Sequence, residues 1–164
     1  MKFPKKTLIV VFISIGVLIL SGYQFQSTRI TTAANEEETS LIRGKISDQT
    51  AVDQCLALLQ KNLTAANEKN VEDYVQTLVK DAQEPTRKEM RAFFSEYDLT
   101  HTLLSFTVVK QEKKSMLVRA EQKTINQGNN EFRNHISEAN HTFVLEDSTW
   151  KIKETVMTNT EFLD

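Results

Sequence analysis

The sequence predicts an α+β protein in which an N-terminal transmembrane helix precedes three helices packed on a curved antiparallel sheet of four or more strands. Three observations support this fold class. An apolar run extends from Leu8 to Leu20 behind three lysines. Apolar residues then recur at helical spacing between residues 52 and 97. After Asp98 the apolar period changes to two, which is typical of strands.

The N-terminal segment favours a signal anchor over a cleaved signal peptide. Residues 7–23 make 17 residues, the lower limit for a spanning helix, and Tyr23 lies where an aromatic interface anchor belongs. The small-x-small pattern at residues 32–34 lies beyond the usual cleavage distance. We therefore interpret residues 1–23 as a cytoplasmic tip and a transmembrane anchor, and we expect membrane contact through residues 7–23. Cleavage is the alternative, and it would release a chain that starts near Asn35. Both readings predict an extracytoplasmic domain, and the first predicts a single-pass protein of the cell membrane.

Residues 24–47 are predicted to form a polar tether. They are rich in Thr, Gln and Glu and show no apolar periodicity, so they bury too little surface to offset the entropy cost of ordering. Leu41, Ile42 and Ile46 are the exception. They either begin the first helix or pack on the domain.

Residues 48–164 are long enough for one domain with one core. They carry fourteen Lys and Arg against nineteen Asp and Glu, a net charge of −5, which argues against a nucleic-acid partner. Cys55 is the only cysteine, so no disulfide forms within the chain, and the three histidines show no zinc-ligand spacing. The sequence predicts neither a metal nor another cofactor.

Two helices are predicted first. One begins at Ser47 or Asp48, and a second, shorter helix is capped by Asn70 with acidic residues in its first turn. The stripe of the first helix comprises Val52, Leu56, Leu59, Leu63 and Ala66; the buried face of the second comprises Val71, Tyr74, Val75 and Leu78.

A third helix is predicted after an interruption at residues 81–85, which end in Pro85. Thr86 and Glu89 have the spacing of a capping box. The expected buried face of this helix comprises Met90, Phe93, Phe94 and Tyr97.

Four strands are predicted to follow as an antiparallel meander. The first spans about residues 103–110, and the second buries Met116, Val118 and Ala120. The third covers about residues 131–146. Its apolar parity slips between Ile136 and Phe143, which predicts a bulge near residues 137–140. The last strand carries Trp150, Ile152 and Val156.

Two segments carry a family resemblance: Asn-Val-Glu-Asp-Tyr at residues 70–74, and His-Thr-Phe-Val-Leu-Glu-Asp-Ser-Thr-Trp-Lys-Ile at residues 141–152. With the order of elements over residues 50–158, they resemble the nuclear transport factor 2-like superfamily. The resemblance implies a cone in which helices fill the concave face of the sheet. That fold hosts isomerases, dehydratases, hydrolases and proteins without chemistry, so it implies no activity.

The candidate pocket-lining residues are Tyr74, Phe94, Tyr97, Gln122, His141 and Trp150. His141 shares parity with the apolar residues that follow it and is the better catalytic candidate. Glu121 lies with Arg119 and Lys123 on a face expected to be solvated. Neither His141 nor Glu121 has an evident acid–base partner, so no catalytic residue is assigned. His135 is expected on the polar face of its strand. His101 is expected at the start of the sheet, after a helix, where it could be a loop residue.

Three functions follow from these observations. The preferred one is a membrane-anchored, extracytoplasmic interaction or scaffold domain without catalysis, with an envelope protein or a second copy as partner. The others are a small-molecule or peptide-binding module that uses the cone cavity, and an enzyme with His141 or Glu121 as acid or base. A filled apolar cavity favours the first, isolated polar groups in an open cavity the second, and a coupled acid–base pair the third.

Overall fold

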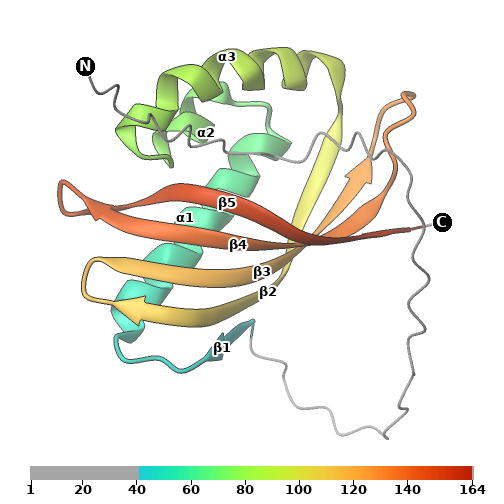
Figure 1. The fold of residues 1–164 in the computed structure, drawn as a ribbon. Helices are drawn as coiled ribbons and strands as arrows, with labels where there is room; N and C mark the ends of the chain where they lie inside the picture. The colour runs from blue at the N-terminus through green and yellow to red at the C-terminus, as the bar shows by residue number, and fades with distance from the viewer. Residues whose placement is uncertain (1–40, 164) are drawn as a thin grey trace, which may run out of the picture.

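The computed structural model describes residues 41–163, in which three helices cover one face of a five-stranded sheet (Figure 1). In chain order the elements are β1 Ile42–Gly44, α1 Gln49–Asn67, α2 Val71–Gln76, α3 Lys80–Glu96, β2 Leu99–Glu112, β3 Ser115–Asn126, β4 His135–Glu146 and β5 Thr149–Phe162. The predicted α+β class is confirmed, and from α1 onward the helices precede the strands as predicted; strand β1, which comes before α1, was not predicted.

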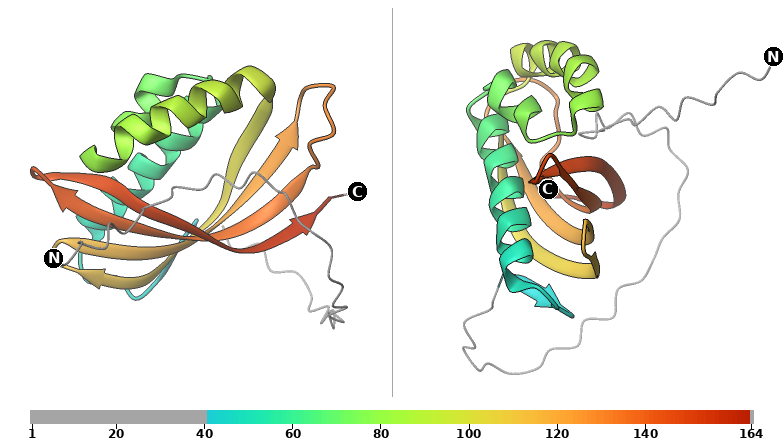
Figure 2. Two further views of the ribbon diagram at one scale, coloured as in Figure 1. Left: turned by 45° about the horizontal axis from the view of Figure 1, so that its top comes forward. Right: turned by 90° about the vertical axis from the view of Figure 1, so that its left-hand side faces the viewer.

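The sheet is mixed rather than wholly antiparallel. Its order is β1-β2-β3-β4-β5, and β2 to β5 form the predicted antiparallel meander. The extra strand β1 runs parallel to β2, with Ile42 opposite Phe106. Figure 2 shows the sheet curving beneath the helices, with α1 lying along its concave side.

Strand β1 lies within the segment that the sequence assigns to a tether. The Leu41 carbonyl accepts a hydrogen bond from the Phe106 N–H at 3.0 Å, and the Gln111 side chain bonds both Ser47 and Asp48. Gly44 has φ +108°, and a Cβ there would lie 2.2 Å from the Val108 carbonyl oxygen. Only glycine fits this close approach. Of the two alternatives for Leu41, Ile42 and Ile46, the structure shows packing on the domain.

The first two helices begin as predicted. The Asp48 carboxylate accepts the Ala51 N–H at 3.0 Å, and the Asn70 side-chain oxygen accepts the Asp73 N–H at 3.1 Å. Helix α2 is shorter than predicted, because Leu78 lies outside it and forms a parallel bridge to Ile152 on β5. A contact distant in sequence therefore ends α2.

The predicted start of the third helix is wrong. Helix α3 begins at Lys80, contains Pro85 and buries Thr86 instead of using it as a cap. The first N–H of the helix, that of Lys80, finds its acceptor on β4: it donates a hydrogen bond to Glu146 Oε2 at 3.1 Å. Pro85 removes only the bond to the Asp81 carbonyl, which lies on an exposed residue. Helix α3 therefore tolerates the proline.

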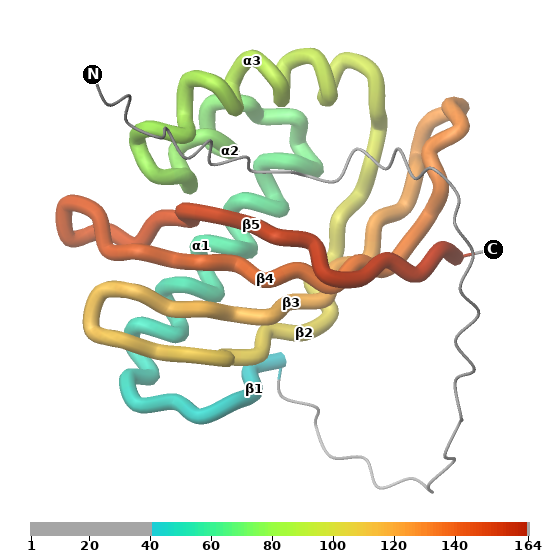
Figure 3. The backbone as a smooth tube through the Cα atoms, viewed as in Figure 1, coloured from blue at the N-terminus to red at the C-terminus, as the bar shows by residue number. Residues whose placement is uncertain are grey.

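A register shift is found between Glu138 and Ala139, within the predicted region, but the extra residue lies on the partner strand β5 and not on β4. Further bulges lie on β2 and β5. The β2 register skips Leu104 and Val109, and the β5 register skips Lys153 and Thr158. The two β2 residues are 41% and 47% exposed, so bulging turns them out of the core. The smooth tube in Figure 3 shows the change of direction along the long strands. An extra residue on one strand bends the sheet in this way.

Strand β4 keeps one register against β3 over residues 135–144 and has no parity slip. Its inward residues are all odd-numbered: His135, Ser137, Ala139, His141 and Phe143. Ile136, on which the predicted slip depended, is half-buried on the outer face.

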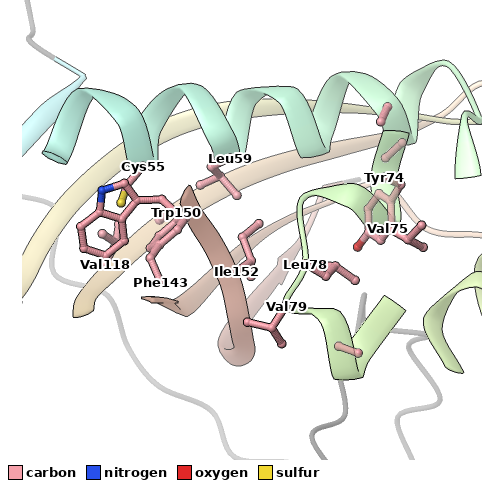
Figure 4. Close-up of a cluster of buried hydrophobic side chains, with 14 of the residues drawn as sticks. Cys55, Leu59, Tyr74, Val75, Leu78, Val79, Val118, Phe143, Trp150 and Ile152 are labelled. Carbon is pink, nitrogen blue, oxygen red and sulfur yellow. The ribbon is translucent and has the colours of Figure 1, made fainter. Parts of the chain in front are cut away.

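The main core lies between α1 and the left half of the sheet in Figure 1, extended by the turn after α2 (Figure 4). Phe143, Val118, Cys55, Leu78 and Ile152 are each at most 2% exposed. Cys55 is the predicted small buried residue of α1. The predicted inward set on β3, which comprises Met116, Val118 and Ala120, is confirmed.

The predicted anchor at residues 7–23 and the tether up to residue 40 lie outside the described residues. Within residues 41–163, no helix has both the length and the hydropathy needed to cross a bilayer.

Candidate functional site

A cavity of about 60 Å³ lies between the C-terminal half of α1 and the concave face of the sheet. Its walls combine apolar side chains with polar ones. The apolar part comprises Leu63, Ala66, Leu99, Phe132, Ala139 and Met157; the polar part comprises Asn62, Tyr74, Gln122, Thr124, Ser137, Thr155 and the histidines at 101, 135 and 141.

His141 forms the floor of the cavity. It is 3% exposed, and its ring nitrogens contact Thr155 Oγ1 at 3.0 Å and Gln122 Nε2 at 3.2 Å. Because Gln122 Nε2 is only a donor, His141 Nε2 accepts and Nδ1 carries the proton. Burial lowers the pKa of His141 to about 4, so the ring is neutral at pH 7.

The other two histidines also line this cavity, which the sequence analysis missed. His135 was expected on the polar face, but it is 6% exposed, and its Nδ1 donates to the Arg133 carbonyl at 2.9 Å. His101 was expected either to begin the sheet or to lie in a loop; it lies near the start of β2, with Nδ1 3.0 Å from Thr124 Oγ1. Burial and the neighbouring His135 lower the pKa of His101 to about 4. The predicted parity slip is what misplaced His135: without it, His135 shares the odd-numbered parity of His141 and Phe143 and falls on the inward face.

The helix side of the cavity is held by a hydrogen-bonded set at the α1–α2 junction. Asn62 Nδ2 donates to Thr77 Oγ1 at 2.7 Å, and Thr77 Oγ1 donates to the Tyr74 carbonyl at 2.6 Å. Complete burial raises the pKa of the Tyr74 hydroxyl, so it remains protonated. Throughout residues 41–163, each buried side-chain nitrogen or oxygen has a hydrogen-bond partner.

Three of the six predicted lining residues, Tyr74, Gln122 and His141, lie in the cavity wall. The other three are packed elsewhere. Phe94 meets the Tyr74 ring edge-on at 6.0 Å, and Tyr97 packs against Phe93 and Phe132. Trp150 is buried beside Cys55 at the opposite end of α1 (Figure 4).

Glu121 lies on the outer face of β3, away from the cavity. It is exposed, and its carboxylate accepts a hydrogen bond from Ser105 Oγ at 3.0 Å. Arg119 and Lys123 share this face and are exposed as well. The two residues considered as acid or base, His141 and Glu121, therefore face opposite sides of the sheet.

The cavity lining offers groups for hydrogen bonding. Its lining holds no Asp, Glu, Lys or Arg, so no charged partner raises the basicity of a histidine. A volume of about 60 Å³ has room for a few waters. Pockets for drug-sized ligands span roughly 300–1,000 Å³. The cavity is therefore smaller than the pockets that usually hold drug-sized ligands.

Solved structures with the same fold confirm the predicted cone. A protein of unknown function from Mycobacterium tuberculosis has a TM-score of 0.62 at 11% identity, covering 68% of this chain and 77% of its own. An NTF2-like protein of unknown function from Pseudomonas putida has a TM-score of 0.59 at 10% identity, covering 68% and 87%. A putative dehydratase of the NTF2-like family from Streptomyces avermitilis has a TM-score of 0.58 at 11% identity, covering 65% and 94%.

Such low identities support the fold and not an activity. A search of curated proteins finds no match. A protein-family comparison does: residues 57–163, from the middle of α1 to the end of β5, match the family described as the C-terminal domain of anti-sigma-I factor RsgI9. The chain therefore belongs to the family of the anti-sigma-I factor RsgI9 C-terminal domain.

Proposed function

We propose that residues 41–163 form the non-catalytic, extracytoplasmic interaction domain of a membrane-anchored regulator. The observation that carries this proposal is the match of residues 57–163 to the C-terminal domain of an anti-sigma-I factor. Anti-sigma factors act by binding proteins, so the family favours a protein partner over a substrate. The net charge of −5 on residues 48–164 argues separately against a nucleic-acid partner.

The proposed topology decides which partner the folded domain can meet. The lysines before the apolar run favour a cytoplasmic N-terminus, and residues 7–23 would then cross the membrane. A sigma factor acts in the cytoplasm, on the opposite side from the domain. The partner of the domain is therefore an envelope protein or a second copy, and any effect on a sigma factor passes through the anchor.

The cavity supports a role without catalysis. His141 is neutral at pH 7 and bonded to Thr155 and Gln122, so it is held in place by other uncharged groups. The small volume and the lack of charged lining residues disfavour both alternative functions, a substrate pocket and a site for a sizeable ligand.

Topology is tested by labelling introduced cysteines in intact cells with a membrane-impermeant maleimide. Lys113→Cys lies in the exposed β2–β3 turn and should be labelled before lysis. Lys5→Cys, in the predicted cytoplasmic tip, is the matched control and should be labelled only after lysis. The native Cys55 thiol is buried, so it should not react with the maleimide in either variant. Labelling of both variants, or of neither, in intact cells would overturn the topology.

The interaction role is tested in cells with a sigma-dependent reporter and in-cell crosslinking of the anchored chain. His141→Ala and Glu121→Gln should leave both the reporter and a reproducible crosslinked partner unchanged. Trp150→Ala removes a buried ring and should lower abundance, at a cost of about 3–5 kcal/mol. Loss of regulation by His141→Ala at normal abundance and an unchanged melting temperature would replace this proposal with a ligand or active site around His141.

A further inference from the structure

One part of the cavity wall is not built from a helix or a strand. Of the lining residues within the described chain, Phe132 alone lies in a loop, the connection of residues 127–134 between β3 and β4. We call this connection the gate loop. Figure 1 shows it, in orange, rising from the sheet near the point where α3 passes into β2. Phe132 is half-buried, and Glu131 and Arg133 on either side of it are exposed, so the Phe132 ring separates the cavity from solvent.

The Phe132 ring closes the cavity through contacts with two other rings. It meets Tyr97, the C-cap of α3, edge-on with centroids 5.3 Å apart, and it lies 5.6 Å from the ring of His135. Both contacts are made by side chains and neither involves the backbone of a strand. The Phe132 ring can therefore turn outward without breaking the sheet.

The backbone around Phe132 is held by side-chain amides and not by strand pairing. Among the described residues, backbone–backbone hydrogen bonds hold the gate loop only at its two ends, Gln127 and Asn134. Between these ends, Asn126 Nδ2 donates to the Phe132 carbonyl at 3.1 Å and to the Asn130 carbonyl at 2.9 Å. Asn126 belongs to β3, so its side chain fastens the gate loop to the sheet.

Every other route into the cavity is closed by regular structure. The remaining lining residues of the described chain lie on α1, α2 and the strands β2 to β5. Opening the cavity there would separate hydrogen-bonded strands or lift α1 from the main core, which takes more free energy than moving a loop. The gate loop is therefore the part of the wall that opens most easily.

We propose that Phe132 is the gate of the cavity. The Asn126 contacts release, the gate loop moves outward, and the Phe132 ring leaves Tyr97 and His135, which opens a path from solvent. This inference concerns access to the cavity and requires neither the predicted anchor nor the proposed function.

The gate controls access to all three histidines of the chain, since each of them lines the cavity. His135 is the first that an entering molecule meets, because its ring touches Phe132. Its Nδ1 donates to the Arg133 carbonyl, so in the neutral ring Nε2 carries the lone pair. His141 lies on the floor of the cavity with both ring nitrogens bonded, and we expect it to be reached last.

The test is modification of the histidines by diethyl pyrocarbonate, which transfers an ethoxycarbonyl group to an unprotonated imidazole nitrogen. The full chain is treated in detergent micelles at neutral pH, and adducts on each histidine are followed by peptide mass spectrometry. Phe132→Ala removes both ring contacts and should speed the modification of His135 by roughly tenfold or more. Asn126→Ala keeps the Phe132 ring but releases the gate loop, so it should speed the same modification.

The matched controls are Asn129→Ala and Glu131→Ala, which change exposed side chains of the same loop outside the cavity lining and should leave the rate unchanged. Cys55 is buried at the opposite end of α1 and reports global unfolding (Figure 4). Its reaction with a maleimide, measured in parallel, should stay slow in every variant.

Two results would overturn the gate. One is an unchanged rate at His135 in both Phe132→Ala and Asn126→Ala with Cys55 still protected. The other is modification of His135 in the native chain as fast as in Phe132→Ala, because the cavity would then already be open. If Phe132→Ala also exposes Cys55, the comparison of Asn126→Ala with Asn129→Ala decides: a faster rate in Asn126→Ala supports the gate, and equal rates overturn it.

Discussion

Lowering the pH from 7.5 to 5.0 should destabilise the domain through its buried histidines, and His141 gives the clearest case. Its pKa is lowered from 6.5 to about 4 by burial, so the folded state disfavours the protonated ring. The stability that this shift contributes is present above the unfolded pKa of 6.5. It is lost as the pH falls, because the unfolded chain binds the proton first.

The size of the loss follows from the two pKa values. At pH 5, a group with pKa 6.5 unfolded and about 4 folded lowers the free energy of unfolding by about 2 kcal/mol relative to pH 7.5. His141 is 3% exposed, so solvent screening reduces this figure little. His101 shifts in the same direction and adds to the total loss.

The assay is urea denaturation of residues 41–164 at both pH values, with native His141 and with His141→Gln. Glutamine stays neutral, so the variant should lose about 2 kcal/mol less than the native domain between pH 7.5 and 5.0. Asn140→Gln, on the outer face of the same strand, is the control and should keep the native pH dependence. An identical pH-dependent loss in His141→Gln and the native domain would refute the assignment of a neutral, desolvated ring.

Three further predictions concern stability and reactivity. Gly44→Ala should lower the free energy of unfolding by about 1–3 kcal/mol in urea melts, because the new Cβ meets the Val108 carbonyl at a φ that alanine avoids; no loss would mean that β1 is not held as described. The Cys55 thiol, whose pKa burial raises to about 12, should not react with a disulfide reagent at pH 8 until the domain is unfolded; fast labelling of the native domain would contradict its burial. Asn70→Ala should lower the free energy of unfolding by about 1 kcal/mol in the same melts, because it removes the N-cap of α2. Glu89→Ala should lower it by almost nothing, because Glu89 lies inside α3 and does not cap it. Equal losses would support the predicted capping box of Thr86 and Glu89 instead.

Elements with a strong local period were predictable. The α1 stripe, the Asn70 cap and the alternation of Met116, Val118 and Ala120 each depend on neighbours within one element, and each is found in the structure. The start of α3 was not predictable, because Glu146 on a distant strand satisfies the Lys80 amide. Local capping chemistry at Thr86 therefore predicted the wrong boundary.

The candidate site was predictable only in part, for a related reason. Period-two reasoning placed His141 on the inner face, but the predicted parity slip hid His135 and Ser137, which β4 also turns inward. These polar residues are tolerated inside because partners on other segments meet them: Thr155 and Gln122 at His141, and the Arg133 carbonyl at His135. No single strand carries that information.

The sequence by itself determined the α+β class, the helix-then-strand order, the buried cysteine and the expectation of a membrane anchor, because these depend on composition and local periodicity. Only the tertiary structure decided that β1 joins the sheet, that three histidines share one chamber and that Trp150 lies outside it. The physical reason is that strand pairing, bulges and the satisfaction of buried polar groups join residues far apart in the chain. Their energies are set by the partner and not by the local sequence.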